Sequence, residues 1–99
     1  MSSGRLNYYQ ERIIPILAKY RVRKAAFFGS LVEGKMRKGS DIDILVEPPK
    51  SMSLLGFVGL KQDIEDHVQK DIDLVSYNGL SPYLKKHILS QQQVFYEAE

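Results

Sequence analysis

Hydrophobic side chains recur every three or four positions over two stretches of the chain, as expected for amphipathic helices. The first stretch spans residues 6–20, and its apolar members are Leu6, Tyr9, Ile13, Ile16, Leu17 and Tyr20. Pro15 lies inside it, so we expect a break or kink there, because proline lacks the backbone N–H that a helix uses. The second stretch spans residues 53–69, and its apolar members are Leu54, Leu55, Val58, Leu60, Ile64 and Val68.

Three short apolar runs predict strands, at residues 24–28, 41–46 and 71–77. The first run stops at Gly29 and Ser30, and the second is closed by Pro48 and Pro49, which end sheet pairing. Further expected elements are a helical turn at 31–33, a basic loop at 34–39, a helix opened by Ser81 and Pro82, and a tail at 94–96 that packs onto the core. This order predicts an α+β or α/β layer arrangement, in a single domain over residues 1–99.

Composition narrows the class of protein further. The 99 residues are 43% hydrophobic and 26% charged, which is typical of a soluble globular domain. The absence of cysteine excludes disulfides and thiolate metal sites, and it fits a reducing, cytoplasmic location. No apolar run is long enough for a membrane span. The formal net charge of +2 gives no case for direct nucleic-acid binding.

Aspartates that alternate along two of the predicted strands suggest a metal site. Asp41 and Asp43 point to one side of their strand, about 7 Å apart, while Ile42, Ile44 and Val46 point the other way, into the core. Their charges repel, and a hard divalent cation held between them relieves that repulsion. Magnesium fits, because it takes oxygen ligands and shares its shell with substrate phosphates. A third carboxylate on a neighbouring strand would complete a site for two ions, and both Asp71 and Asp73 are candidates.

The turn after the first strand is suited to binding phosphate. Gly29 lets backbone N–H groups approach an anion closely, and Ser30 adds a hydroxyl donor. Lys35, Arg37 and Lys38 follow in the basic loop, within reach of a triphosphate. The alternative is that Gly29 and Ser30 form a plain turn and that Asp41 merely begins a strand.

Three segments together resemble the minimal nucleotidyltransferases (MNT) of the DNA polymerase β-like superfamily. They are Phe-Gly-Ser-Leu-Val-Glu-Gly at 28–34, Ser-Asp-Ile-Asp-Ile-Leu-Val at 40–46 and Asp-Leu-Val at 73–75. The resemblance covers nearly the whole chain. It implies the polymerase β-like nucleotidyltransferase fold, an α+β fold with a small mixed sheet and helices packed on it.

The resemblance also implies roles for individual residues. The Gly29-Ser30 turn would hold the triphosphate, and Asp41, Asp43 and Asp73 would bind two Mg²⁺ ions. The family pattern of aspartate followed by Leu-Val favours Asp73 over Asp71 as the third ligand. Leu31 departs from the pattern, since many relatives place arginine there. Phosphate binding would then depend on the basic residues of the loop at 34–39.

A function follows from the same resemblance. Minimal nucleotidyltransferases are commonly paired with HEPN-domain toxins, and they act as antitoxins by moving AMP from ATP to a tyrosine hydroxyl of the toxin. The partners expected here are therefore a nucleoside triphosphate and a HEPN-domain toxin, in a homo- or hetero-oligomer. Two alternatives remain open: transfer to a small molecule held by a separate subunit, and a non-catalytic module that masks its partner.

Overall fold

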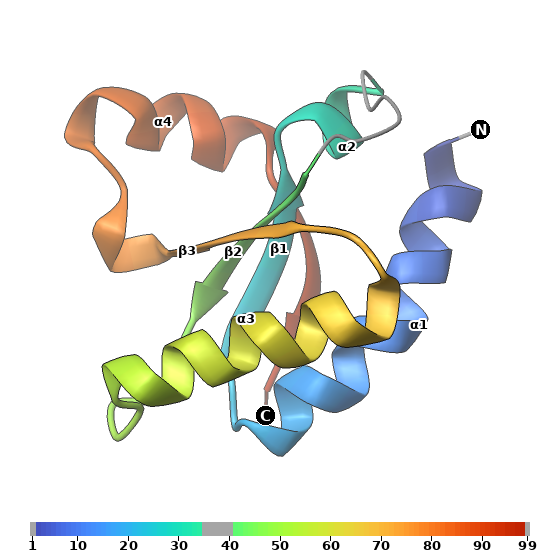
Figure 1. The fold of residues 1–99 in the computed structure, drawn as a ribbon. Coiled ribbons are helices and arrows are strands. Elements are labelled where there is room, and N and C mark those ends of the chain that lie inside the picture. Colours follow the sequence, from blue (N-terminus) through green and yellow to red (C-terminus); the bar gives the residue numbers. More distant parts are fainter. Residues whose placement is uncertain (1, 35–40, 99) are drawn as a thin grey trace.

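The computed structural model describes residues 2–34 and 41–98, which form one four-stranded sheet with helices on both sides (Figure 1). In chain order the elements are α1 (Ser2–Lys19), β1 (Lys24–Phe28), α2 (Ser30–Glu33), β2 (Ile42–Glu47), α3 (Leu54–Val68), β3 (Ile72–Ser76), the 3-10 turn η1 (Tyr77–Gly79), α4 (Pro82–Gln91) and β4 (Gln93–Glu97). The three strands and the helices expected from the sequence are confirmed within these bounds.

The sheet has the strand order β3-β2-β1-β4. β1 is antiparallel to both of its neighbours, whereas β2 and β3 are parallel. A parallel pair needs a crossover connection, and α3 provides it. The predicted small mixed sheet is therefore confirmed, and the parallel pair is the unit that carries both aspartate motifs.

α1 and α3 cover one face of the sheet and bury its apolar side chains. Ile13 and Leu17 of α1 meet Ile64 of α3 over Phe27 and Ile44 of the sheet, and all five side chains are almost completely buried. α4 lies on the other side of the strands (Figure 1), and none of its side chains is buried. Among the described residues, no helix has the length and apolar character needed to cross a membrane.

Local sequence explains where the helices begin. Ser53 caps α3 by accepting a hydrogen bond from the Gly56 N–H at 3.1 Å, and Ser81 caps α4 ahead of Pro82. α1 continues through Pro15, so a break at that residue is wrong, while a kink there stays a prediction. Pro15 lies on the exposed side of α1, where water can satisfy the carbonyl that loses its partner.

The C-terminal segment packs on the core as predicted, but it does so as a strand that the sequence pattern did not indicate. β4 pairs antiparallel with β1 and shifts register between Ala25 and Ala26. Phe95 stacks on Phe27 with ring centroids 4.1 Å apart. The tail thereby closes one edge of the sheet and ties the end of α4 to β1.

Candidate active site

Strand pairing brings the glycine turn and two aspartates into adjacent rows of the sheet. Phe28, the last residue of β1, is paired with Asp43 on β2, and Asp43 is paired with Asp73 on β3. Gly29 directly follows Phe28, so the turn begins beside Asp43. Segments that are 14 and 30 residues apart in the sequence, counted from 29 to 43 and from 43 to 73, therefore meet at one place.

Gly29 lies directly against Asp43, in a backbone conformation that strains any residue with a Cβ. Gly29 has φ of 71°, a left-handed conformation that side chains with a Cβ rarely adopt. A Cβ added to it would overlap Oδ2 of Asp43. The backbone N–H of Ser30 also donates a hydrogen bond to the Asp43 carboxylate. The turn predicted to bind phosphate thus also holds an aspartate in place, a contact that no motif in the sequence indicates.

Asp43 is half-buried among like charges, and its protonation reflects this. The pKa of Asp43 is raised to about 6, first by burial and then by the negative charges of Asp73 and Asp41, while the hydrogen bond from the Ser30 N–H acts in the opposite direction. The Asp43 and Asp73 carboxyl groups lie within hydrogen-bonding reach of each other, and this contact also raises the pKa of Asp43. A cation placed at this pair would favour the charged form of Asp43.

The carboxylates of Asp41, Asp43 and Asp73 could supply part of the oxygen shell of a magnesium ion. Within residues 2–34 and 41–98, no three carboxylate or imidazole side chains gather closely enough to form a complete metal site. Asp43 nevertheless lies close enough to Asp73 and Asp41 for their charges to raise its pKa. Magnesium is usually bound through one or two carboxylates together with substrate phosphates, so this incomplete set of donors is compatible with the ion.

The other predicted site residues are placed as follows. Asp41 is exposed immediately before β2. Asp71 is also exposed, its backbone carbonyl accepts the Ile42 N–H at 3.0 Å, and it is absent from the charges that raise the pKa of Asp43. Asp73 rather than Asp71 thus faces Asp43, although its role as a ligand stays a prediction. The predicted phosphate ligands Lys35, Arg37 and Lys38 lie outside the described residues.

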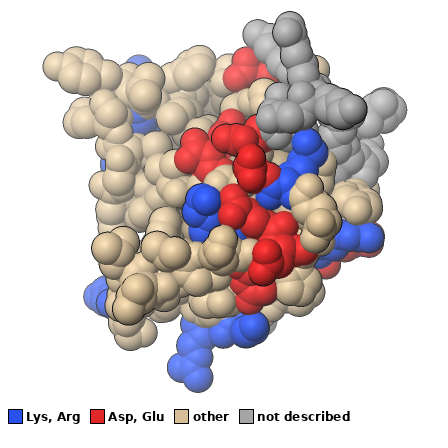
Figure 2. Space-filling model, in the orientation of Figure 1, with Lys and Arg blue, Asp and Glu red and all other residues tan. Residues whose placement is uncertain are grey.

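Acidic side chains are concentrated on the face that carries these strands. Figure 2 shows Asp and Glu gathered in one band at the middle of the view, over β3 and the adjoining part of α3. The part of this face over α4 and the start of α3 is mostly uncharged. Lys and Arg side chains also border the band (Figure 2), but its acidic centre disfavours a free anion and favours one that carries a cation, such as a magnesium-bound triphosphate.

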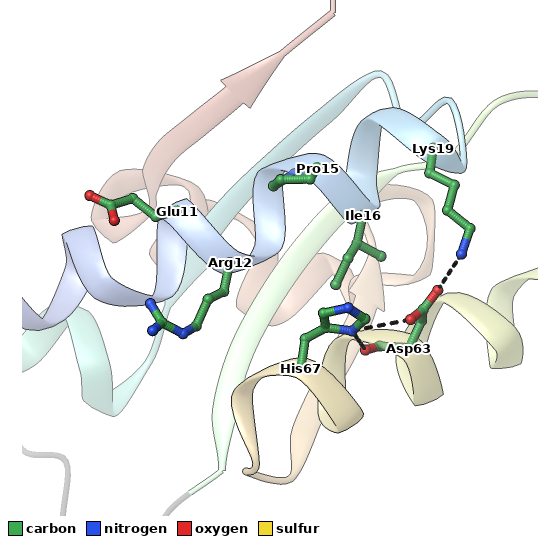
Figure 3. A pocket seen from close by; sticks show the side chains of 7 residues that line it. All are labelled: Glu11, Arg12, Pro15, Ile16, Lys19, Asp63 and His67. Carbon is green, nitrogen blue, oxygen red and sulfur yellow. Dashed lines mark hydrogen bonds and ion pairs between the residues drawn. The ribbon is translucent and has the colours of Figure 1, made fainter.

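A pocket of about 360 Å³ lies elsewhere, between α1 and α3 (Figure 3). Asp63 ties the two helices together there, since it accepts hydrogen bonds from Lys19 at 3.0 Å and from Tyr20 at 3.2 Å. These contacts lower the pKa of Asp63, and the hydrogen bond raises the pKa of Lys19. The charges are paired among the helices themselves, so we assign this pocket to packing. Its lining residues are Glu11, Arg12, Pro15, Ile16, Lys19, Asp63 and His67.

Comparison with known proteins places this geometry in a family. The sequence model described as "Polymerase beta, Nucleotidyltransferase" matches residues 11–99. A candidate protein adenylyltransferase of Methanocaldococcus jannaschii is 42% identical over 86 residues, which cover 87% of this chain and 92% of that protein.

Solved structures share the fold. A candidate minimal nucleotidyltransferase superimposes with a TM-score of 0.80 at 29% identity, over 93% of this chain and 94% of the other. A chain in the structure of a tri-AMPylated HEPN toxin from Shewanella oneidensis in complex with MNT antitoxin superimposes with a TM-score of 0.72. That chain is 21% identical, and the match covers 99% of this chain and 74% of the other, so it shows the fold alone. The chain belongs to the polymerase beta nucleotidyltransferase family, and it is an enzyme that transfers nucleotidyl groups.

Proposed function

We propose that this enzyme is a magnesium-dependent protein adenylyltransferase that moves AMP from ATP to a tyrosine hydroxyl of a HEPN-domain toxin and thereby acts as its antitoxin. The observation that carries the proposal is the Asp43–Asp73 pair, set against the Gly29-Ser30 turn at one end of the sheet. It combines a ligand pair for a hard cation with backbone N–H groups for phosphate. The proposal also treats residues 1–99 as one functional domain.

The proposed roles follow from position and charge. Asp43 and Asp73 hold magnesium through their facing carboxylates, and the exposed Asp41 adds a further oxygen beside the triphosphate. The Gly29-Ser30 turn is proposed to hold the phosphates through the Ser30 hydroxyl and the backbone N–H groups at the start of α2, since the Ser30 N–H itself donates to Asp43. Lys35, Arg37 and Lys38 are proposed as further phosphate ligands. We propose two magnesium ions, since three carboxylates and a triphosphate provide oxygens for both.

The reaction is an in-line displacement at the α-phosphorus of ATP. The acceptor oxygen forms a bond to that phosphorus, the bond to the bridging oxygen of the β-phosphate breaks, and pyrophosphate leaves. When bound, magnesium offsets the charge on the phosphates and lowers the pKa of the acceptor hydroxyl. Asp73 is positioned on the edge strand to receive the proton of that hydroxyl. Alignment by the turn and the carboxylates supplies most of the remaining acceleration.

The nature of the acceptor is inferred from relatives. The Methanocaldococcus jannaschii relative carries the name of a protein adenylyltransferase, and a structure with the same fold contains an AMPylated HEPN toxin with MNT antitoxin. A tyrosine hydroxyl suits the chemistry, because its pKa near 10 is within reach of metal-assisted deprotonation.

The test is to incubate the chain with ATP, magnesium and the HEPN-domain protein encoded beside it, and then to weigh that protein intact. We expect it to gain one or more AMP units on tyrosine and to lose toxicity. Asp43→Asn should abolish the gain. A partner that is bound and silenced without added mass would overturn the proposal in favour of a masking module, and AMP found only on a small molecule would favour a separate acceptor subunit.

A further inference from the structure

α4 has an unusual composition for a surface helix beside an acidic site. Residues 74–96 contain no aspartate or glutamate, and Lys85 and Lys86 are their only lysines or arginines. Both lysines are exposed, as is the aromatic ring of Tyr83 two positions earlier. The exposed surface at the start of α4 is thus apolar and basic, whereas the neighbouring strands carry the acidic band.

The apolar part of this surface is left open to solvent. Tyr83 is 95% exposed and Leu84 is 55% exposed. A ten-residue helix is marginally stable by itself and normally gains stability by burying one side, yet α4 buries no side chain. It is held at its ends instead. Ser81 caps the start of the helix, and Tyr77 donates a hydrogen bond of 2.6 Å to Gln92 beyond its end.

α4 is also directed at the candidate site. It begins after η1, beyond the end of β3, and returns along the sheet to β4, where Gln93 is paired with Phe27. Phe27 is two residues before Gly29, so the end of α4 lies near the glycine turn. Figure 1 shows α4 on the side of the sheet opposite α1 and α3. This is the side toward which Asp43 points, since its neighbours Ile42 and Ile44 face the core.

We propose that the exposed first turns of α4, where Tyr83, Leu84, Lys85 and Lys86 are all open to solvent, form the docking surface for the protein acceptor. The inference rests on the proposed function, because it assumes that the acceptor is a protein. The occupant is a protein surface with exposed apolar side chains bordered by aspartate and glutamate. Tyr83 and Leu84 bury against the apolar part, the lysines pair with the acidic border, and the acceptor hydroxyl is held over the carboxylates of β2 and β3.

Two other occupants of this surface suit it less well. A nucleotide would leave the exposed Leu84 without a partner, and the proposed function already gives it the Gly29-Ser30 turn and the carboxylates of the candidate site. A second copy of the chain, paired through α4 about a two-fold axis, would bring Lys85 and Lys86 of both copies together. Like charges in such an interface disfavour association, whereas an acidic partner is attracted to the same lysines.

The test compares the double variant Tyr83→Ser/Leu84→Ser with Tyr8→Ser. Tyr8 is a matched control, since it is 48% exposed but belongs to α1 on the far side of the sheet. We expect the double variant to raise the KM for the HEPN-domain protein at least tenfold. Its kcat and the thermal stabilisation by magnesium-ATP should stay unchanged, because the site itself is intact. Tyr8→Ser should change none of these quantities.

Charge reversal gives an independent readout. Lys85→Glu with Lys86→Glu should weaken partner binding and should abolish the loss of affinity that wild type shows on adding salt. A direct binding measurement separates this inference from the proposed function. If the partner binds wild type without being modified and does not bind these variants, the docking surface is supported even though the proposed function fails. Unchanged KM and binding in both variants would overturn it, and so would a wild-type dimer that dissociates in Tyr83→Ser/Leu84→Ser.

Discussion

Replacing Asp43 by asparagine should stabilise the metal-free protein at neutral pH. The pKa of Asp43 is about 6 in the folded chain, against an ordinary value of 3.8. At 1.36 kcal/mol for each tenfold change in proton affinity, this difference corresponds to about 3 kcal/mol. Asp43 keeps some contact with water, and screening reduces the figure to on the order of 1–2 kcal/mol. Asparagine is nearly isosteric and carries no charge, so the variant avoids this cost.

The effect has a defined dependence on pH. Between about pH 4 and pH 6 the folded wild type holds more protons than the unfolded chain does, so its free energy of unfolding falls as the pH rises. Above pH 6 the cost of the charged Asp43 is complete. The advantage of Asp43→Asn should therefore be close to zero near pH 4, grow through this window and stay constant above it.

Urea unfolding in EDTA at several pH values between 4 and 8 measures this difference. Asp71→Asn is the matched control, because Asp71 is exposed and is not among the charges that act on Asp43; it should change stability by less than about 0.5 kcal/mol. A variant less stable than wild type at pH 7.5, or an advantage that is the same at pH 4 and pH 8, would refute the assignment of buried like charge to Asp43.

Four further outcomes are expected. Gly29→Ala should lower the free energy of unfolding in urea by about 1–3 kcal/mol, because alanine is strained at the positive φ of this turn. The variant should also lose transfer activity, because the new Cβ would displace the Asp43 carboxylate. Asp73→Asn should abolish transfer in the intact-mass assay while Asp71→Asn keeps most of it, and the reverse result would make Asp71 the third ligand. Magnesium-ATP at a hundredfold excess over its Kd should raise the free energy of unfolding by about 2.7 kcal/mol. The Tm should therefore rise more with magnesium and ATP together than with either one alone. Ser53→Ala should cost about 1 kcal/mol by removing the cap of α3, without changing kcat.

The sequence predicts much of the fold because its signals are local. The run from Lys24 to Phe28 stops at a glycine, and Ser81 precedes a proline; each motif acts within a few residues, and the structure has the expected element at both places. β4 carries no such signal. Only Phe95 and Tyr96 of its five residues are partly buried, and its partner β1 lies almost 70 positions earlier, so neither alternation nor spacing reveals it.

The candidate site likewise has features that local sequence predicts and features that depend on long-range pairing. The types of residue at Gly29, Asp41 and Asp43 were sufficient to suggest phosphate and metal chemistry. The choice between Asp71 and Asp73 depends on which of them faces Asp43, and that is set by the length of α3 and the register of two strands. The contact of the glycine with Asp43 likewise depends on pairing between β1 and β2. Contacts that depend on strand pairing cannot be predicted from the spacing of residues in the sequence.

Nearly identical segments lie side by side in the parallel pair of β2 and β3, and this creates an ambiguity for the folding chain. Residues 41–46 read Asp-Ile-Asp-Ile-Leu-Val and residues 71–75 read Asp-Ile-Asp-Leu-Val, with Ile42 opposite Ile72. Sliding one strand by two residues preserves the alternation of apolar and acidic positions and again sets aspartate opposite aspartate. Alternation therefore cannot select the native alignment. Glu65 contributes to that selection, because its Oε2 accepts the backbone N–H of Ile72 at 2.9 Å and holds the start of β3 against α3. A carboxylate outside the candidate site thus helps to position the strand that brings Asp73 beside Asp43, so the folding of this strand and the geometry of the site are linked.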